Sequence, residues 1–378
     1  MDKTINETFG ISNTSATPAT NVTTPSISLP DLPEISQIFP HISIGLLKLT
    51  PHVEETLWGG SFFSSLYNLP SSSRIGETWE LAMFDSEPIE KQTLIQGMAI
   101  NDFIGDVNKY NFWGPEGKNS YVIKYIDTSL NLSVQVHPDD FWCKRHGHKK
   151  EKNECWIILN TEKGAGLYLG IKDQFTFNDF EHAVLMGLDL KKYLNFIEVN
   201  EGDFFVIPAG LIHSIGEGIR LLEIQQNSNV TYRVWDWNRT DKHGVKRELH
   251  AKQALDVISS NMHLNYLHGI QKQEKIWDII NNTTTTNTTT ITTQKKLLIK
   301  HDDFSVDALA LMNGSCFNLS LEKFKRPVSL LCLKGEAEIL RGEEKIKCNP
   351  YETILMPHNG YPLIQILSKD DCNIAIVY

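Results

Sequence analysis

The sequence predicts a mainly β protein, a sandwich or barrel of short strands with a few inserted helices. Short runs rich in β-branched and aromatic residues recur from residue 44 onwards, and Gly, Pro, Asn and Asp separate them. Evenly spaced short strands of this kind are typical of closed β architectures. In the first two thirds of the chain, strands are expected at 44–49, 77–83, 121–126, 132–137, 155–159, 203–207, 219–226 and 231–235.

Helical periodicity interrupts the strands at three places. Residues 98–110, 177–194 and 248–259 each predict a helix; in the last, apolar residues recur on one face. Strand-like runs return near the end of the chain, at 330–333, 336–340, 353–356 and 374–377. These runs predict a second, smaller β domain.

Two segments of biased composition divide the chain into domains. Residues 1–42 are rich in Ser, Thr, Asn and Pro and predict a disordered tail, without the Arg-rich amphipathic pattern of a transit peptide. Residues 281–294 are almost entirely Thr and Asn and predict a linker. We therefore expect a catalytic domain at 43–280 and a C-terminal β domain at 295–378.

Bulk properties exclude several classes of function. The net charge of −10 over 378 residues argues against a nucleic-acid-binding protein, which normally has a basic surface. The six cysteines contain no CxxC pair and predict reduced thiols in a cytoplasmic protein. No apolar run is long enough to cross a membrane. The sequence does not indicate an oligomeric state.

Four side chains form a candidate metal site. Gln135 and His137 are two residues apart on a predicted strand, so they leave the same face. Glu154 begins another strand-like run, and His213 follows a Pro-x-Gly turn. Two histidines, one carboxylate and one amide oxygen suit a single divalent metal with room for a ligand. Each residue alone has an ordinary structural explanation; the combination favours a metal.

The same residues carry a resemblance to a known family. Residues 202–213 have the form G-x5-P-x-G-x2-H, which resembles the second signature of cupins. Gln135 stands where the first cupin signature normally has His, and Glu154 lies further along than usual. That combination resembles the type I phosphomannose isomerases, in their shorter bacterial-type branch. Further similar segments, in the family's order, are 58–60, 76–81, 132–140, 153–156, 208–218, 222–226 and 231–239.

The resemblance implies two cupin-like, jelly-roll barrels and a mannose-6-phosphate isomerase. One zinc ion would be held by Gln135, His137, Glu154 and His213. The reaction would interconvert mannose 6-phosphate and fructose 6-phosphate through a cis-enediol(ate), within carbohydrate metabolism and GDP-mannose biosynthesis. By resemblance, Arg233, Glu223 and Lys152 are candidate catalytic residues, and Ser133 and Lys124 are candidate contacts to the sugar phosphate. Glu223 and Lys152 are both possible bases, and the sequence does not choose between them.

Two other functions are compatible with a cupin fold. A cupin oxygenase or decarboxylase would use iron or manganese and normally a His-rich ligand set, so Gln135 counts against it. A sugar-phosphate-binding protein without catalysis would not need every candidate residue. In the C-terminal domain, residues 349–362 have the shape of the second cupin signature, but Pro362 stands at the position that matches His213. The second barrel is therefore expected to hold no metal.

Overall fold

The computed structural model describes residues 45–378, apart from 85–86, 149, 242, 267–269, 274–275, 278–292 and 359–361. The predicted tail, and residues 281–292 of the predicted linker, lie outside the described residues. Residues Ser43–Tyr378 form one compact unit. The predicted mainly β fold is confirmed, because this unit is built from antiparallel sheets.

Two of the sheets come from the middle of the chain. The seven-stranded sheet has the strand order β15-β11-β8-β13-β6-β3-β2, and the five-stranded sheet has the order β10-β9-β12-β7-β14. The strands of the larger sheet are β2 (His52–Gly60), β3 (Ile75–Leu81), β6 (Tyr121–Asp127), β8 (Glu154–Thr161), β11 (Phe204–Ile207), β13 (Ile219–Gln226) and β15 (Gln271–Gln273). Those of the smaller sheet are β7 (Val134–Val136), β9 (Gly166–Ile171), β10 (Leu194–Glu198), β12 (His213–Ile215) and β14 (Tyr232–Trp235).

The other two sheets come mostly from the end of the chain. The eight-stranded sheet has the order β16-β17-β24-β19-β22-β1-β4-β5, and the four-stranded sheet has the order β18-β23-β20-β21. The larger contains β1 (Leu47–Thr50), β4 (Leu94–Ile95), β5 (Met98–Ala99), β16 (Thr293–Lys300), β17 (Ser305–Leu311), β19 (Val328–Lys334), β22 (Thr353–Met356) and β24 (Cys372–Val377). The smaller contains β18 (Cys316–Ser320), β20 (Ala337–Arg341), β21 (Glu344–Cys348) and β23 (Leu363–Ser368).

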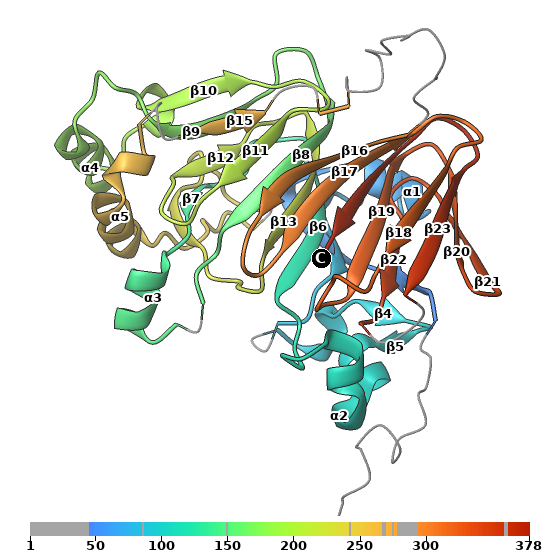
Figure 1. Cartoon of the computed structure of the whole chain (residues 1–378). Coiled ribbons are helices and arrows are strands. Elements are labelled where there is room, and N and C mark those ends of the chain that lie inside the picture. Colours follow the sequence, from blue (N-terminus) through green and yellow to red (C-terminus); the bar gives the residue numbers. More distant parts are fainter. Residues whose placement is uncertain are drawn as a thin grey trace, which may run out of the picture. The chain divides into compact units, whose positions relative to one another are not determined.

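The sheets stack in layers (Figure 1). One apolar core lies between the five- and seven-stranded sheets and includes Trp156 and Leu167. A second core joins the seven- and eight-stranded sheets and includes Ile123 and Val306. A third fills the space between the eight- and four-stranded sheets. The seven-stranded sheet therefore packs against an apolar core on each face.

Helices cover the outer face of the five-stranded sheet. The helices of the described chain are α1 (Phe62–Leu66), α2 (Ile100–Trp113), α3 (Asp140–His146), α4 (Phe177–Leu185) and α5 (Ala251–Ser260), with 3-10 turns η2 (Ile89–Lys91), η3 (Leu190–Lys192) and η4 (Met262–Leu264). Side chains of α3, α4 and α5 pack against those of β7, β9 and β14. This layer holds the small sheet in place behind the candidate site.

One helix is shorter than predicted, and another was not predicted. The helix expected at 177–194 ends at Leu185, because Gly187 adopts a left-handed φ of 64°, and the chain continues into η3 and β10. Helix α3 was not among the predicted helices. Its N-terminus is capped by Asp139, which accepts a hydrogen bond from the Trp142 backbone N–H.

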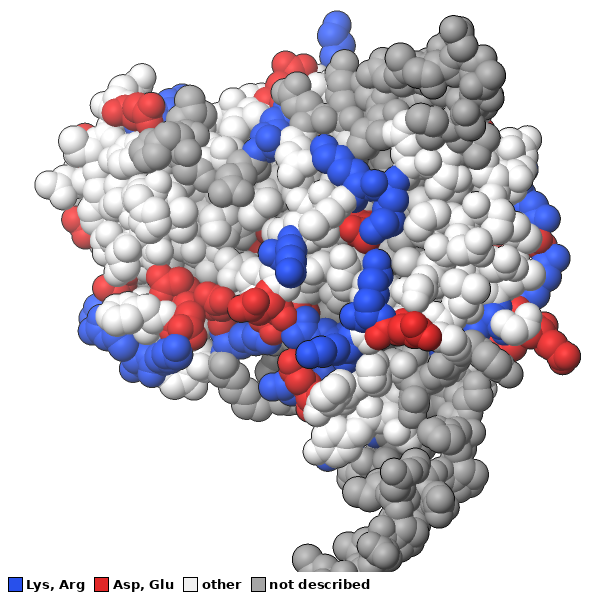
Figure 2. Space-filling model, in the orientation of Figure 1, with Lys and Arg blue, Asp and Glu red and all other residues white. Residues whose placement is uncertain are grey.

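The domain boundary near 280–295 stays a prediction. The N-terminal strand β1 pairs with β22, and β4 with β1, so segments from both sides of that boundary share one sheet. On the face in Figure 2, Lys and Arg side chains form narrow groups with Asp and Glu beside many of them. Among the described helices, none has the length and apolar character needed to cross a membrane.

Candidate active site

A row of charged side chains crosses the inner face of the seven-stranded sheet. Register pairs Glu54 on β2 with Glu77 on β3, and Lys124 on β6 with Glu223 on β13. Glu154 lies at the start of β8, where it pairs with Gln225 of β13. Alternation along each strand turns these residues toward the five-stranded sheet, while their neighbours enter the core on the other side. The charged row was spread over 170 residues of sequence and is assembled only by the sheet.

The opposite wall comes from the five-stranded sheet. In register, His213 on β12 pairs with Gln135 on β7, which pairs in turn with Arg233 on β14. Three predicted site residues therefore lie side by side on adjacent strands. His213 is brought there by the turn at Pro208-Ala-Gly, where Gly210 has a φ of 92° and an added Cβ would lie 2.5 Å from Asn261.

Three buried side chains converge where the two walls meet. His137, Glu154 and His213 each offer a ligand atom within 4.8 Å of the others, and each side chain is about 1% exposed. His137 Nδ1 lies 2.9 Å from the Val230 carbonyl oxygen, and His213 Nδ1 lies 2.8 Å from that of Leu211. Because carbonyls can only accept, each Nδ1 carries the hydrogen, and both Nε2 atoms present lone pairs.

This donor set fits a cation. The Nε2 lone pair of His137 faces Glu154 Oε1 at 3.2 Å, which places two acceptors together in a dry site. Neither carboxylate oxygen of Glu154 accepts a hydrogen bond of regular geometry from the described residues, although Lys152 Nζ forms an ion pair at 2.7 Å. Two neutral imidazoles and one carboxylate are an ordinary ligand set for a divalent metal. These residues could hold one.

Gln135 lies at the edge of this group. Its Nε2 is 3.3 Å from His213 Nε2, and its Oε1 accepts a hydrogen bond of 3.4 Å from Ser133 Oγ. Amide oxygen and nitrogen exchange places on a flip of the side chain. The flipped amide would direct its oxygen toward the three converging residues and its NH2 toward Ser133. Ser133 could then orient Gln135 as a fourth ligand.

A pocket of about 250 Å³ opens above the three converging residues. Its lining includes six predicted site residues: Lys124, Ser133, Gln135, Lys152, Glu223 and Arg233. His137, Glu154 and His213 lie beneath it. All nine predicted site residues are thus brought together, and their assigned roles remain proposals.

The charged side chains of this site shift one another's pKa values. Burial opposes the ionised form of Glu154, but Lys152 and His137 outweigh it and lower the pKa of Glu154 well below its usual value. Burial and the neighbouring His137 lower the pKa of His213 to about 3, so His213 is neutral at physiological pH. Burial and Lys152 also lower the pKa of His137. Both imidazoles therefore stay available as metal ligands.

Glu223 differs from the other carboxylates. Burial and the adjacent negative charge of Glu154 raise the pKa of Glu223 to about 7. Its Oε2 accepts a hydrogen bond of 3.1 Å from Trp156 Nε1, which fixes the carboxyl in the pocket. A carboxyl with a pKa near neutrality can both accept and return a proton.

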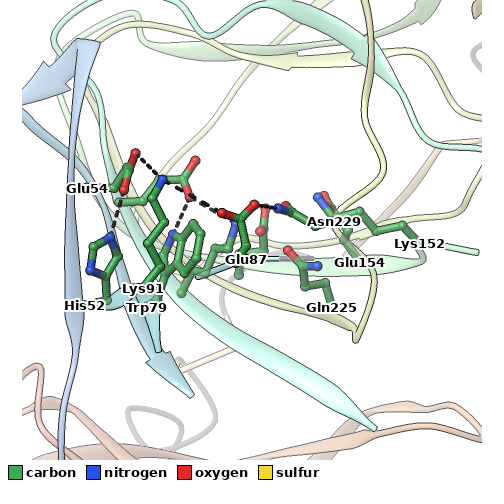
Figure 3. Close-up of polar contacts among 12 residues, drawn as sticks. His52, Glu54, Trp79, Glu87, Lys91, Lys152, Glu154, Gln225 and Asn229 are labelled. Carbon is green, nitrogen blue, oxygen red and sulfur yellow. Dashed lines mark hydrogen bonds and ion pairs between the residues drawn. The ribbon is translucent and has the colours of Figure 1, made fainter. Parts of the chain in front are cut away.

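The structure adds pocket residues that the sequence did not single out. Figure 3 shows contacts running from His52 through Glu54 and Lys91 to Glu87 and Asn229. Lys91 Nζ lies 3.1 Å from Glu54 Oε1 and 4.0 Å from Glu87 Oε2, and Asn229 donates to Glu87. No motif marks these positions, because β2 and η2 are joined to the site only through tertiary pairing. Glu77 and Trp79, by contrast, lie in the segment 76–81 that carried part of the resemblance.

Comparisons with known proteins agree with this geometry. No family model matches the chain. A curated relative, the mannose-6-phosphate isomerase ManA of Bacillus subtilis, is 30% identical over 316 residues, which are 82% of this chain and 93% of the relative. The chain belongs to the mannose-6-phosphate isomerase family. A second relative from the same organism, named probable mannose-6-phosphate isomerase GmuF, is 35% identical over 233 residues, or 60% of this chain and 72% of the relative.

A solved structure of this family has the same fold. The mannose 6-phosphate isomerase from Bacillus subtilis superposes with a TM-score of 0.69 at 19% identity, over 88% of this chain and 99% of the other. The predicted family and its fold are therefore confirmed for this chain.

Proposed function

We propose that this protein is a mannose-6-phosphate isomerase that interconverts mannose 6-phosphate and fructose 6-phosphate with one bound zinc ion. One observation carries the proposal. In a chain of this family, a buried His-Glu-His group lies next to residues of a pocket lined by lysines, arginines and glutamates. Such a pocket suits a small molecule that combines hydroxyl oxygens with a phosphate.

His137, Glu154, His213 and the flipped amide of Gln135 would hold the metal. A bound divalent metal would supply Lewis-acid stabilisation of negative charge on the substrate. Only one of these four ligands is anionic, so the site keeps a net positive charge. Zinc suits the two imidazoles and single carboxylate of this set.

The chain's own residues would move and stabilise charge around that centre. Isomerisation transfers a proton between carbons 2 and 1 through a cis-enediol(ate), so a base must reach both carbons. Glu223 and Lys152 lie on the pocket floor and are the candidates for taking and returning this proton. Arg233 would stabilise negative charge on the opposite wall. Ser133 and Lys124 would contact the substrate.

The proposed location is the cytoplasm. All six cysteines are free, five of them buried, in agreement with a reducing compartment.

The test is turnover by the purified, zinc-loaded protein. Mannose 6-phosphate should yield fructose 6-phosphate, activity should disappear with a chelator, and zinc should restore it. Arg233→Ala should lose turnover while its metal content, measured in parallel, stays the same. Absence of product from metal-loaded protein would exclude the proposal. Oxygen consumption by the iron-loaded protein would favour a cupin oxygenase instead.

A further inference from the structure

One side-chain amide joins the segments that carry Glu154 and His213. Asn153 directly precedes Glu154, which begins β8, and its Oδ1 accepts a hydrogen bond of 2.8 Å from the Ala209 backbone N–H. Ala209 is the central residue of the Pro208-Ala-Gly turn that leads to His213. Asn153 therefore ties together two of the three segments whose side chains converge beneath the pocket.

Gln226, the last residue of β13, fixes the position of Asn153. Its Oε1 accepts two hydrogen bonds of 2.8 Å, one from the backbone N–H of Asn153 and one from Asn153 Nδ2. The backbone N–H of Gln226 also donates to the Asn153 carbonyl oxygen at 3.0 Å, and Gln226 is only 1% exposed. Asn153 is thus held through both its main chain and its side chain.

The other end of the Gln226 amide contacts the eight-stranded sheet. Its Nε2 donates to Asp303 Oδ2 at 2.5 Å, and Asp303 lies in the turn between β16 and β17. The second carboxylate oxygen of Asp303 forms an ion pair of 2.5 Å with Nζ of Lys150, which lies in the segment leading to Glu154. Ser120 Oγ donates to the Asp303 carbonyl oxygen at 2.7 Å, which holds the turn beside the start of β6.

The carboxylate of Asp303 sets the direction of these hydrogen bonds. A carboxylate can only accept, so the NH2 of Gln226 faces Asp303 and, at 3.3 Å, Glu151. The oxygen of the same amide is left to face the N–H groups of Asn153. Burial opposes the ionised form of Asp303, but hydrogen bonds from Lys150 and Gln226 outweigh it and lower its pKa. Without Asp303 the amide could flip and would place its NH2 against the N–H groups of Asn153.

We propose that Asp303 is a positioning residue of the metal site, which acts through Gln226 and Asn153. This hydrogen-bonded chain fixes the segments that carry Glu154 and His213, so that their ligand atoms are held together before a metal binds. The inference rests on the proposed metal site. The contact belongs to the β16–β17 turn and not to the interior between the eight- and four-stranded sheets, so changes in that interior should leave it in place.

The test measures the affinity of the metal-free protein for cobalt(II), through the visible absorption of the bound ion. Asn153→Ala should weaken cobalt binding by about 10- to 100-fold, because residues that orient metal ligands typically contribute on this scale. Asp303→Ala acts one residue further away and should weaken it by about 10-fold. Asp303→Asn, which keeps the shape but accepts only one of the two bonds, should lie between Asp303→Ala and the wild type.

A double variant distinguishes positioning from a general loss of stability. If Asp303 acts through Asn153, the variant that combines Asp303→Ala with Asn153→Ala should bind cobalt as Asn153→Ala alone does. Two independent effects would instead multiply. Losses of cobalt affinity that multiply would therefore overturn the proposed route through Asn153.

Tyr351→Phe is the matched control. It removes a different contact between β13 and the C-terminal strands, the hydrogen bond of 3.3 Å that Arg220 Nη1 donates to Tyr351 Oη. Arg220 lies at the opposite end of β13 from Gln226, so the variant should bind cobalt as the wild type does. Equal weakening in Tyr351→Phe, or wild-type affinity in Asp303→Ala, would overturn the proposal. If Asp303→Ala does not fold, wild-type affinity in Asp303→Asn would overturn it equally.

The outcomes separate this proposal from the function on which it rests. Cobalt binding that depends on Asp303, in a protein that does not isomerise mannose 6-phosphate, would support the positioning role and exclude the isomerase. Isomerase activity with wild-type cobalt affinity in Asp303→Ala would do the reverse.

Discussion

The two β-sandwiches of this protein, one made by the five- and seven-stranded sheets and the other by the eight- and four-stranded sheets, repeat the same strand–turn–strand unit. In the first, Ile207-Pro208 ends β11, and β8 pairs Glu154 with Ile207. In the second, Met356-Pro357 ends β22, and β19 pairs Val328 with Met356. Val328 therefore occupies the register position of Glu154. In the next pair of strands of the second sandwich, Ser320 pairs with Leu363, which directly follows Pro362, the residue that matches His213 in the motif.

The interiors differ accordingly. The first sandwich buries lysines, carboxylates and histidines on facing walls. The apolar core of the second consists of Leu, Ile, Val, Ala, Phe, Met and Cys side chains, and Asp307 and Arg341 are its buried charged residues in the described chain. Buried charges lower stability unless they are paired or bind a ligand. The comparison shows that the same arrangement of paired strands can carry side chains that bind a ligand or side chains that only pack. Four predictions would break or sharpen this comparison.

The largest effect is expected at His213. His213→Ala should lower the metal content from about one per chain to well below that. It should also lower kcat/KM by about 1000-fold or more, because Lewis-acid stabilisation worth several kcal/mol is lost. Metal analysis and the isomerase assay measure both. Pro362→Ala, at the matching motif position of the second sandwich, should change neither quantity. A second metal ion per wild-type chain would break the comparison.

The second-largest effect is expected at Glu223. Glu223→Gln should reduce kcat by about 100- to 10,000-fold with metal retained, because an amide cannot act as the base. Glu80 provides a matched control: it is also buried, and burial raises its pKa to about 7, but it accepts hydrogen bonds from Thr78 and Thr353 between the two sandwiches. Glu80→Gln should keep the wild-type kcat. Equal losses of kcat in both variants would show that Glu223 does not act in the reaction.

A change in the second sandwich should alter stability alone. Ile339 is fully buried between its two sheets. Ile339→Ala should lower the free energy of unfolding by about 2–4 kcal/mol, because a cavity replaces packed methyl groups. Urea unfolding measures this loss. The kcat and metal content of the folded variant should match the wild type, and a fall in either would mean that the second sandwich takes part in catalysis.

The smallest effect depends on pH. The folded-state pKa of Glu80, about 7, lies above its usual value of 4.5, so the protonated carboxyl favours folding. That contribution is complete below pH 4.5 and is lost as the pH rises through 7. Glu80→Gln stays neutral, so at pH 8 it should be more stable than the wild type by about 3 kcal/mol. The difference should vanish near pH 4.5. Melting temperatures of the wild type and the variant at the two pH values test this prediction. A variant that is less stable than the wild type at pH 8 would contradict it.

Each predicted strand run overlaps an observed strand, but several strands, such as β2, β9 and β23, were not predicted, and helix ends were placed less well. The run at 219–226 coincides with β13, whose apolar residues Ile219, Leu221, Leu222 and Ile224 are all buried. The helix at 177–194 was overextended, because the pattern of Phe180, Val184 and Leu188 continues past the turn that Gly187 makes. Helix α3 was missed, because its charged exposed face hides the buried Trp142 and Cys143.

The candidate site likewise contains residues that the sequence could identify and residues that it could not. Gln135, His137, Glu154 and His213 could be named from the sequence, because two strand positions on one face and a Pro-x-Gly turn have local signatures. Glu54, Glu87 and Lys91 could not, since each reaches the pocket through a sheet edge or a short turn with no motif of its own. Asp236 and Arg247 are eleven residues apart, and nothing in their spacing predicts the forked contact between them.

The sequence by itself determined the β-rich fold, the family and the four candidate metal ligands, because alternation and turn chemistry act over a few residues. The tertiary structure decided which charges meet. Antiparallel register set Lys124 beside Glu223, and Gln135 between His213 and Arg233. The same sheet brings Lys124 Nζ to 3.0 Å from Glu77. Electrostatic interactions depend on distance in space and not on separation along the chain, so only the tertiary structure decides such pairs.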